Sequence, residues 1–465
     1  MDPEQVKKRQ TLRVLFSEAM MVVSVIIIMT VLIMITSGYW INQNFEVERQ
    51  GMLQIFSNPT GATIEVDGET GWLVKTNNSK IVSSGEHEVK ISKDGYDSWT
   101  KKVDVKEGLM YRIPYVRLFP LEREAEKINE ISALKNSVSA DFSSMLLIDD
   151  STTWKLLKLS EENVKTTSIE VGGVLSGENL AERITDISWS KNANKVLMKV
   201  ADELGGDWVL IDLKNIEKSL NLTKTFGVDF DDVKIFDQSG DFLLAVNDGD
   251  LRRLDVGAQT MSKVLAEHVL DFNMYNNSVV YVSRGGEGQN SISILKDVDS
   301  KPVTIMSTNF ENAFAAIGRF YDNDFLVVVD GQTLTFYEGQ LSRADRNSFE
   351  QKYSAEISFV PEKIKVDTGG VFFVMRSGRM VAALDMESGD MSEYDVEGDK
   401  IGWIDDYMIY TVNDEGSLIV YDFDGLNRRE LSKNASSRFD AAIFEDKWLY
   451  YFSDGWLVRE NLQAK

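Results

Sequence analysis

Residues 401–421 read IGWIDDYMIYTVNDEGSLIVY, the clearest copy of a pattern that repeats through the C-terminal part of the chain. The copy contains an apolar strand (401–404), a strongly hydrophobic strand (407–412), an Asn/Asp/Gly turn and a third strand (417–421). β-Branched and aromatic residues favour strands, whereas Asn, Asp and Gly favour the tight turns between them. A second clear copy follows at 441–459.

The copies begin near residues 138, 187, 233, 271, 316, 357–370, 401 and 441, a spacing of about 40–45 residues. A four-stranded unit at this period is typical of a β-propeller blade, because only neighbouring blades can cover its two apolar faces. Eight starts predict seven or eight blades over residues 138–465. The last copy has only three strands, so we expect the N-terminal side of the ring to supply its fourth. A pair of β-sandwiches is the alternative, although sandwiches need no regular spacing.

The N-terminal part of the chain carries a long apolar segment. No charged residue lies between Glu18 and Glu46, and residues 19–35 read AMMVVSVIIIMTVLIMI. About 20 apolar residues in a helix span the hydrocarbon core of a bilayer. We therefore predict a transmembrane helix at 19–40 that includes Ala19, Ile27 and Ile35. A cleaved signal peptide is the alternative, but its apolar part is usually only about 7–15 residues long.

Basic residues before the apolar segment predict the orientation of the chain. Lys7, Lys8, Arg9 and Arg13 precede it, and positive charge is enriched on the cytoplasmic side of membrane helices. We expect residues 1–18 to form a short cytoplasmic tail and the rest to lie outside the cell membrane. The absence of cysteine shows that no disulfide stabilises this part, which fits a bacterial envelope protein better than a small eukaryotic ectodomain.

Charge and composition exclude several classes of function. The formal net charge is −24, and the tail is slightly positive, so the exported part is strongly acidic. Such a surface repels phosphate backbones, and no basic cluster is visible in the sequence, so we expect no nucleic-acid partner. The sequence has no cysteine and only two histidines, His87 and His268. It therefore lacks the residues that most zinc sites, haem sites and thiol enzymes need. We assign no catalytic residue, metal or cofactor.

Four short motifs follow the apolar segment in a fixed order. They are Pro59-Thr60-Gly61-Ala62, Val66-Asp67-Gly68, Gly85-Glu86-His87-Glu88-Val89 and Gly95-Tyr96, with Trp99 behind them. The segment 51–120 resembles the PEGA domain, a small β-sandwich of bacterial and archaeal envelope proteins. Thr60 stands where Glu is common, and the usual Thr-Pro after the hairpin is missing. The resemblance implies an extracytoplasmic accessory module that contacts carbohydrate or the envelope.

Aromatic residues are the candidates for ligand contact. Trp72, next to a turn, is open to two interpretations, because a small sandwich needs aromatic core and exposed tryptophans stack on sugars. Trp456 follows the turn Asp454-Gly455 and is the propeller tryptophan that we expect at a rim. The other recurring tryptophans, Trp189, Trp208, Trp403 and Trp448, are expected between blades. A lone histidine such as His87 is expected to be structural.

Paired carboxylates are the remaining source of chemistry. The pairs Asp149-Asp150, Asp231-Asp232 and Asp405-Asp406 lie at expected strand ends or turns, where Asp satisfies local backbone groups. A glycan hydrolase needs two carboxylates about 5–10 Å apart in a concave pocket, and spacing in the sequence does not bring two pairs together. This hydrolase is the alternative function.

Together these patterns predict an all-β exported region with one N-terminal transmembrane helix. We expect a small β-sandwich at 51–120, a charged linker or short helix at 121–137 and a 7- or 8-bladed β-propeller at 138–465. The predicted function is that of a membrane-tethered binding or scaffolding protein. Its propeller would hold an envelope protein or a polysaccharide.

Overall fold

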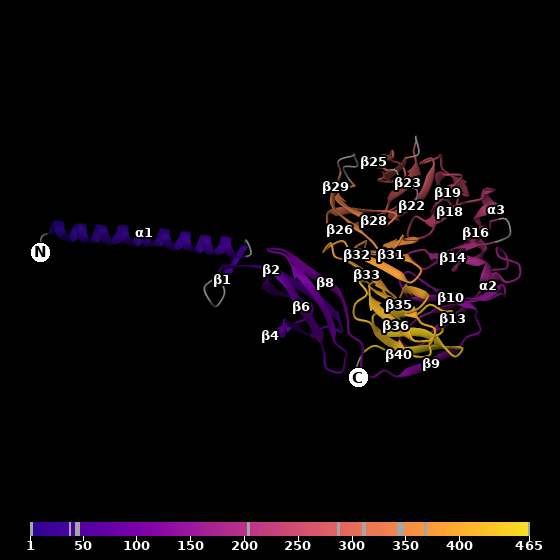
Figure 1. Ribbon diagram of the computed structural model, residues 1–465, viewed down its shortest axis with the longest axis horizontal. Coiled ribbons are helices and arrows are strands. Elements are labelled where there is room, and N and C mark those ends of the chain that lie inside the picture. Colours follow the sequence, from indigo (N-terminus) through magenta and orange to yellow (C-terminus); the bar gives the residue numbers. More distant parts are fainter. Residues whose placement is uncertain are drawn as a thin grey trace. The chain divides into compact units, whose positions relative to one another are not determined.

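The computed structural model describes residues 3–36, 39–41, 47–201, 205–285, 289–308, 313–341, 348–366 and 370–463. The chain divides between Leu121 and Glu122 into two compact units. The first unit contains an apolar helix and a β-sandwich, and the second is a ring of β-sheets (Figure 1).

The first element is the helix α1 (Pro3–Thr36). Its apolar part, Phe16–Met34, has a mean hydropathy of 2.4, and none of it is buried inside the protein. Its 19 residues extend about 28 Å, close to the thickness of a hydrocarbon core. The predicted membrane-length helix is therefore present, with Ala19 and Ile27 exposed on it. Ile35 also belongs to α1, but its side chain lies outside the described residues.

The predicted C-terminal boundary of this helix, Trp40, is wrong. α1 ends at Thr36, and β1 (Tyr39–Ile41) pairs antiparallel with the start of β2 (Val47–Asn58). The Arg49 guanidinium fixes this pairing by donating to the Tyr39 hydroxyl at 3.0 Å. Two aromatic residues and an isoleucine favour a strand, so the sandwich begins within the segment that we expected to complete the helix.

Two four-stranded sheets build the sandwich. The first contains β1, β2, β5 (Asn78–Ser83) and β8 (Met110–Arg117), with β8 parallel to β2. The second has the order β4 (Glu69–Lys75), β3 (Thr63–Val66), β6 (Gly85–Ser92) and β7 (Trp99–Val105). Burial alternates along β6 and β7, as expected for strands with one face on a core. Trp99 is fully buried in this core.

His87 is also structural, as predicted. Its buried ring lies between the Asp67 carboxylate, 2.6 Å from Nδ1, and the Ser83 carbonyl oxygen, 2.8 Å from Nε2. The hydrogen bond with His87, followed by one from the Glu88 amide, lowers the pKa of Asp67 below its usual value. The histidine therefore ties the β3–β4 hairpin to the end of β5.

The described residues of the second unit form eight four-stranded sheets in chain order. The first four contain β10 (Lys135–Val138), β11 (Ser144–Ile148), β12 (Thr153–Lys158) and β13 (Lys165–Glu170); β14 (Ile184–Trp189), β15 (Lys195–Val200), β16 (Asp207–Asp212) and β17 (Leu220–Asn221); β18 (Asp232–Ile235), β19 (Phe242–Asn247), β20 (Asp250–Asp255) and β21 (Thr260–Met261); and β22 (Val269–Tyr275), β23 (Ser278–Arg284), β24 (Asn290–Leu295) and β25 (Val303–Thr308). Short helices α2 (Leu180–Arg183), η1 (Ile216–Lys218) and α3 (Leu222–Phe226) lie between strands.

The remaining sheets complete the ring. They contain β26 (Ala313–Phe320), β27 (Asn323–Asp330), β28 (Thr333–Gly339) and β29 (Phe349–Glu356); β30 (Lys363–Val366), β31 (Phe372–Ser377), β32 (Met380–Asp385) and β33 (Met391–Asp395); β34 (Lys400–Trp403), β35 (Met408–Val412), β36 (Leu418–Asp422) and β37 (Arg429–Ser432); and β38 (Ala442–Phe444), β39 (Trp448–Ser453) and β40 (Trp456–Asn461). The eight first strands begin within three residues of the predicted starts, or inside the predicted 357–370 window. The predicted β-propeller is confirmed, with eight blades.

The fourth strand of the last blade is β9 (Ala125–Glu130), which pairs antiparallel with β40. Figure 1 shows this strand, from the start of the unit, beside the yellow C-terminal strands. The expectation that the N-terminal side supplies this strand is confirmed. The assignment of 121–137 to a linker or helix is wrong, because β9 lies inside that segment. Its side chains are exposed or half-buried, so the strand carries no strong apolar pattern.

Each apolar cluster of the ring is shared by two neighbouring blades. Trp154 of β12 packs with Val196 of β15 in one cluster, and Trp208 of β16 packs with Leu243 of β19 in the next. Met145 of β11 shares a cluster with Tyr450 of β39, which joins the first blade to the last. In each of these clusters of described residues, one blade covers the apolar face of the next, and this mutual dependence is the physical reason for ring closure.

Arg459 of β40 is the polar anchor of this closure. Its buried guanidinium donates to Glu126 Oε2 on β9 at 2.7 Å and to the Glu161 carbonyl oxygen at 2.7 Å. The same group lies 4.5 Å from the Trp448 ring centroid. The side chain thus connects the first and last strands of the ring.

We expect Arg459→Ala to lower the free energy of unfolding by about 2 kcal/mol, because it removes the charged hydrogen bonds that this buried side chain donates and its packing on Trp448. Chemical denaturation of the full chain in detergent measures this loss. Arg428→Ala is the matched control, since Arg428 forms an exposed ion pair with Glu397; we expect it to cost less than about 1 kcal/mol. Equal losses in the two variants would contradict the role of Arg459.

Candidate functional site

The first strands of the blades lie toward the centre of the ring. Neighbouring first strands contact each other, as β14 does with β18 and β22 with β26. Middle strands such as β11 and β35 are buried along their whole length, whereas several first strands carry charged side chains. Among these are Lys135 on β10, Lys365 on β30 and Lys400 on β34. The fold therefore places polar groups from separate blades around the ring centre.

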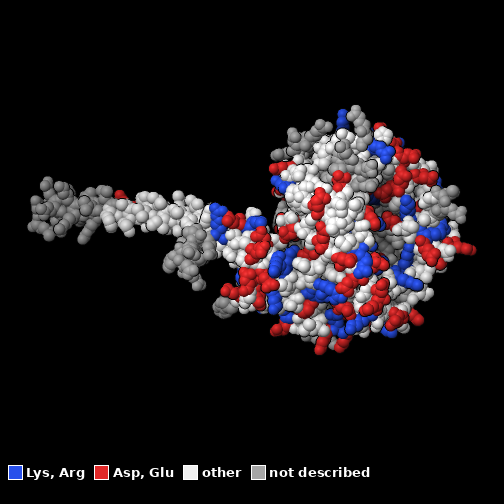
Figure 2. Space-filling model, in the orientation of Figure 1, with Lys and Arg blue, Asp and Glu red and all other residues white. Residues whose placement is uncertain are grey.

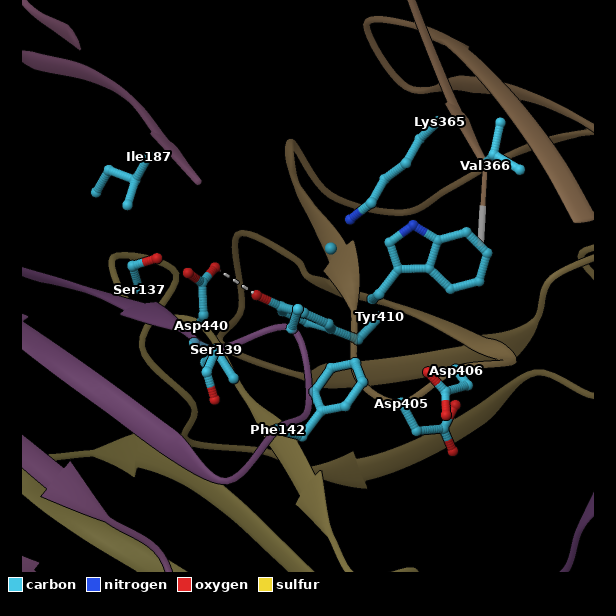
Figure 3. Close-up of a pocket in the computed structure, with 14 residues that line it drawn as sticks. Ser137, Ser139, Phe142, Ile187, Lys365, Val366, Asp405, Asp406, Tyr410 and Asp440 are labelled. Atoms are coloured by element: carbon cyan, nitrogen blue, oxygen red, sulfur yellow. Dashed lines mark hydrogen bonds between the residues drawn. The ribbon is translucent and has the colours of Figure 1, made fainter. Parts of the chain in front are cut away.

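A cavity of about 280 Å³ lies among these strands, and we call it the central cavity. It is bounded by Ser137 and the residues after β10, by Lys365 of β30, by Trp403 of β34, by Tyr410 of β35 and by Asp440 just before β38 (Figure 3). Its walls come from strands or loops of several blades, which shows that the ring, rather than any one blade, creates it.

Asp440 is the best-anchored group in the central cavity. Its carboxylate accepts a hydrogen bond from the Tyr410 hydroxyl at 2.8 Å and pairs with Lys400 Nζ at 2.6 Å. Its backbone amide donates to the Asn136 side-chain oxygen at 2.6 Å, and its carbonyl accepts from the Asn136 amide at 3.1 Å. Burial, with the Asp440 charge as a second cause, raises the pKa of Tyr410 well above its ordinary value, so Tyr410 serves as a neutral donor.

Gly402 makes room for the Tyr410 side chain. The two residues are direct partners in the β34–β35 ladder. A Cβ atom at position 402 would lie 2.6 Å from Cε1 and 3.0 Å from the hydroxyl oxygen of Tyr410. Only a residue without a side chain allows the tyrosine to cross β34 and reach Asp440.

Lys365 is a cation of the central cavity that lies beside an aromatic ring. Its Nζ lies 5.9 Å from the Trp403 ring centroid, and Figure 3 shows it pointing into the cavity. Among the residues that the structure describes, none forms a hydrogen bond or ion pair with this ammonium group. Desolvation by the surrounding protein lowers the pKa of Lys365, and the Asp440 charge opposes this effect only in part. The side chain is nevertheless open to the water of the cavity.

Lys135 of β10 is a second partly desolvated cation, and it lies near Lys400. Its Nζ donates to the Ile184 carbonyl oxygen at 2.6 Å. Desolvation, followed by repulsion from Lys400, lowers its pKa. Lys135 and Lys400 thus repel each other, whereas the Asp440 carboxylate pairs with Lys400 and attracts Lys365.

Two of the predicted carboxylate pairs accept hydrogen bonds from backbone amides of the turns in which they lie. Asp149 accepts from the Ser151 amide at 2.8 Å, and Asp405 accepts from the Tyr407 and Met408 amides at 2.9 and 2.7 Å. These two residues fulfil the predicted turn role. Asp405 and Asp406 do reach the central cavity, although the turn engages Asp405.

Asp232 meets a different carboxylate at the ring centre, Asp271 of β22. Lys234 Nζ lies 3.3 Å from Asp232 and 3.6 Å from Asp271, and it also donates to the Phe272 carbonyl oxygen. Desolvation raises the pKa of Asp271, which is a property of a general acid. The ammonium group, however, bridges the two carboxylates where a hydrolase would place the glycosidic bond, so this pair does not favour the hydrolase.

The predicted contact tryptophans lie elsewhere. Trp456 begins β40, is half-buried and has Lys127 Nζ 5.5 Å from its ring centroid. Its role as a contact residue remains a prediction. Trp72 lies on β4, but its side chain is outside the described residues.

Trp403 is a site residue that sequence reasoning assigned to another place, and Lys365, Tyr410 and Asp440 were not singled out at all. We expected Trp403 between blades with Trp189 and Trp208; Trp208 is indeed buried there, but Trp403 lines the central cavity. The available signal was the Lys-x-x-Trp sequence of β34, because a charged residue beside an aromatic one is unusual for a strand packed on both faces.

Comparison with known families identifies the sandwich. The family model described as PEGA domain matches residues 50–117. Residues 50–117 form a PEGA domain. The match agrees with the motifs around Gly61 and Asp67 and with the two-sheet topology. No curated protein matches the chain.

Solved β-propellers are similar to much of the chain. The C-terminal WD40 domain of Sif2 has 14% identity, with 73% of this chain and 99% of that chain covered and a TM-score of 0.46. The computationally designed Ika8 protein has 11% identity, coverage of 72% and 98%, and a TM-score of 0.43. The Myceliophteria thermophila Cps50 (Swd1) β-propeller domain has 9% identity, coverage of 73% and 100%, and a TM-score of 0.40. The assignment of the fold rests on the sheet topology described above.

We expect Gly402→Ala to destabilise the protein by about 1–3 kcal/mol, because the added methyl group overlaps the buried Tyr410 ring. Thermal unfolding of the full chain measures the loss. Gly173→Ala is the control, since a Cβ at Gly173 meets no atom within 4 Å. If both variants unfold at the wild-type temperature, the close approach of Gly402 and Tyr410 is contradicted.

We also expect the Lys365 amine to lose its proton below the usual lysine value of about 10.4, because desolvation disfavours its charged form. Trace labelling with an amine-reactive reagent across a pH series, read by peptide mass spectrometry, gives the midpoint. Asp440→Asn should lower this midpoint further, because it removes a nearby negative charge. A midpoint at or above the usual value would contradict the desolvation of Lys365.

Proposed function

We propose that this chain is a membrane-tethered, extracytoplasmic binding or scaffolding protein of a bacterial cell envelope. In this proposal α1 anchors the chain, the PEGA domain lies next in the sequence and the propeller holds an envelope protein or a polysaccharide. The observation that carries the proposal is the apolar helix: the Phe16–Met34 segment is 0% buried inside the protein. An uncovered and largely apolar segment of 19 residues needs another apolar environment, and a bilayer supplies one.

Two further observations support the proposal. The PEGA match is typical of extracytoplasmic modules, and it begins close behind the helix. The propeller has a polar central cavity with a lysine that the fold does not pair among the described residues. Both signs of charge are spread over the visible face of the chain (Figure 2), and that mixture suits protein partners better than nucleic acid.

The tether is tested by fractionation of cells that express the full chain. We expect the protein to remain with the membranes after alkaline carbonate extraction. The mass of the intact protein should include its N-terminal residues. Protease added to spheroplasts should degrade the propeller, because the bulk of the chain lies outside. Ile27→Arg is the variant that should release the protein into the soluble fraction, since a charge at the centre of a span costs about 3 kcal/mol.

If the measured mass shows that the mature protein lacks its first residues, the apolar helix is a cleaved signal sequence and the tether is overturned. Protection of the propeller in spheroplasts, with degradation after lysis, would overturn the orientation. If the tether holds, crosslinking on intact cells followed by mass spectrometry identifies the partner, and an untethered wild-type propeller serves as the comparison.

A further inference from the structure

The central cavity has an unbalanced charge on one side. Lys135, Lys365 and Lys400 come from three blades and gather around Asp440. Lys400 pairs with Asp440, the Asp440 charge acts on Lys365, and Lys135 lies close enough to Lys400 to be repelled by it. Asp440 is the carboxylate that acts on Lys400 and Lys365, and its Oδ1 already pairs with Lys400 and accepts the hydrogen bond of the Tyr410 hydroxyl. Asp405 and Asp406 lie toward another end of the cavity from Lys365 (Figure 3). The lysine side therefore has more positive charge than the nearby carboxylate neutralises.

Such an arrangement favours an anion. An ammonium group held in a partly desolvated site without a carboxylate is costly, and a bound anion removes this cost. The ammonium group of Lys365 provides donors that no described residue accepts. The ring of Trp403 and the hydroxyl group of Ser137, which accepts from the Trp189 ring nitrogen and keeps its own proton to donate, provide further contacts. The lysine side of the cavity is thus equipped to bind a small anionic group that also carries polar atoms.

Size and long-range charge restrict the anion. A cavity of about 280 Å³ accommodates one small ligand and is at the lower limit of ordinary ligand pockets. The protein as a whole has a net charge of −24, so polyanions are repelled before they reach the ring. Asp440 also disfavours a dianion such as phosphate, because its own charge lies among the lysines. A single carboxylate satisfies all three restrictions.

We propose that the lysine side of the central cavity binds the carboxylate of a small ligand no larger than an acidic monosaccharide. Lys365 is the residue that contacts the carboxylate, and Lys400, oriented by Asp440, supplies a second positive charge. Trp403 forms the flat wall against which the body of the ligand packs. The inference rests on the proposed binding function, since it names the class of ligand that the propeller holds.

The experiment is protection of Lys365 from a water-soluble amine-reactive reagent in the purified full chain in detergent, read by peptide mass spectrometry. The probes are sodium glucuronate, sodium acetate, sodium phosphate, glucose and sodium chloride, with ionic strength matched among the salts. We expect glucuronate to slow the labelling of Lys365, and glucose to require at least about a tenfold higher concentration for equal protection. Lys263, an exposed lysine beyond the outer strand β21, is the internal control and should label at one rate throughout.

Substitution makes the test specific for the site. Lys400→Gln should raise the concentration of glucuronate that gives half-protection of Lys365 by about tenfold, which corresponds to one lost charge-assisted contact. Lys263→Gln, which removes the same charge at the periphery, should leave half-protection unchanged. Thermal unfolding of each variant verifies that the ring is folded.

Each protection result either supports or overturns the proposed carboxylate site. Stronger protection by glucuronate than by acetate identifies an acidic sugar, and equal protection identifies a carboxylate on any small ligand; both support the proposal. Equal protection by sodium chloride or glucose, better protection by phosphate, or no effect of Lys400→Gln overturns it. Because the assay uses purified protein, its result does not depend on the membrane tether, whose failure would show in the fractionation experiment alone.

Discussion

The antiparallel pairing of β9 with β40 is the contact on which the rest of the propeller depends. Each apolar cluster is shared by two blades, so an open ring would leave the cluster between the last and the first blade half exposed. The pairing also covers the free edge of the last sheet, which would otherwise be available to another chain. Closure joins residues that are more than three hundred positions apart, and Arg459 and Glu126 are such a pair.

The same closure assembles the central cavity. Asp440 belongs to the last blade and Asn136 to the first, and their two mutual hydrogen bonds exist only in the closed ring. Asp440 then holds Lys400 and receives the Tyr410 hydroxyl, which reaches it across Gly402. A site built in this way is rigid, because moving any one of these groups breaks contacts in neighbouring blades.

The fold was largely predictable from the sequence, for a clear physical reason. The second strands of the blades are buried on both faces, so their hydrophobic runs repeat at the period of the blade, as at 407–412. The strands at the margins were harder to predict. β9 is an outer strand whose side chains are exposed or half-buried, and its charged sequence therefore resembled a linker. At the helix boundary, Tyr39 and Trp40 were compatible with a membrane interface until their pairing with β2 was visible.

The sequence by itself determined the apolar helix, the PEGA motifs and the repeat of the blades, because each depends on neighbours within one short segment. Only the tertiary structure decided that Lys365, Trp403 and Asp440 line one cavity, with Lys400 paired to Asp440 and Lys135 near Lys400. These residues belong to separate blades, and each of them is unremarkable within its own strand. Their convergence follows from the number of blades and the register of closure, which are properties of the whole ring and leave no local signal in the sequence.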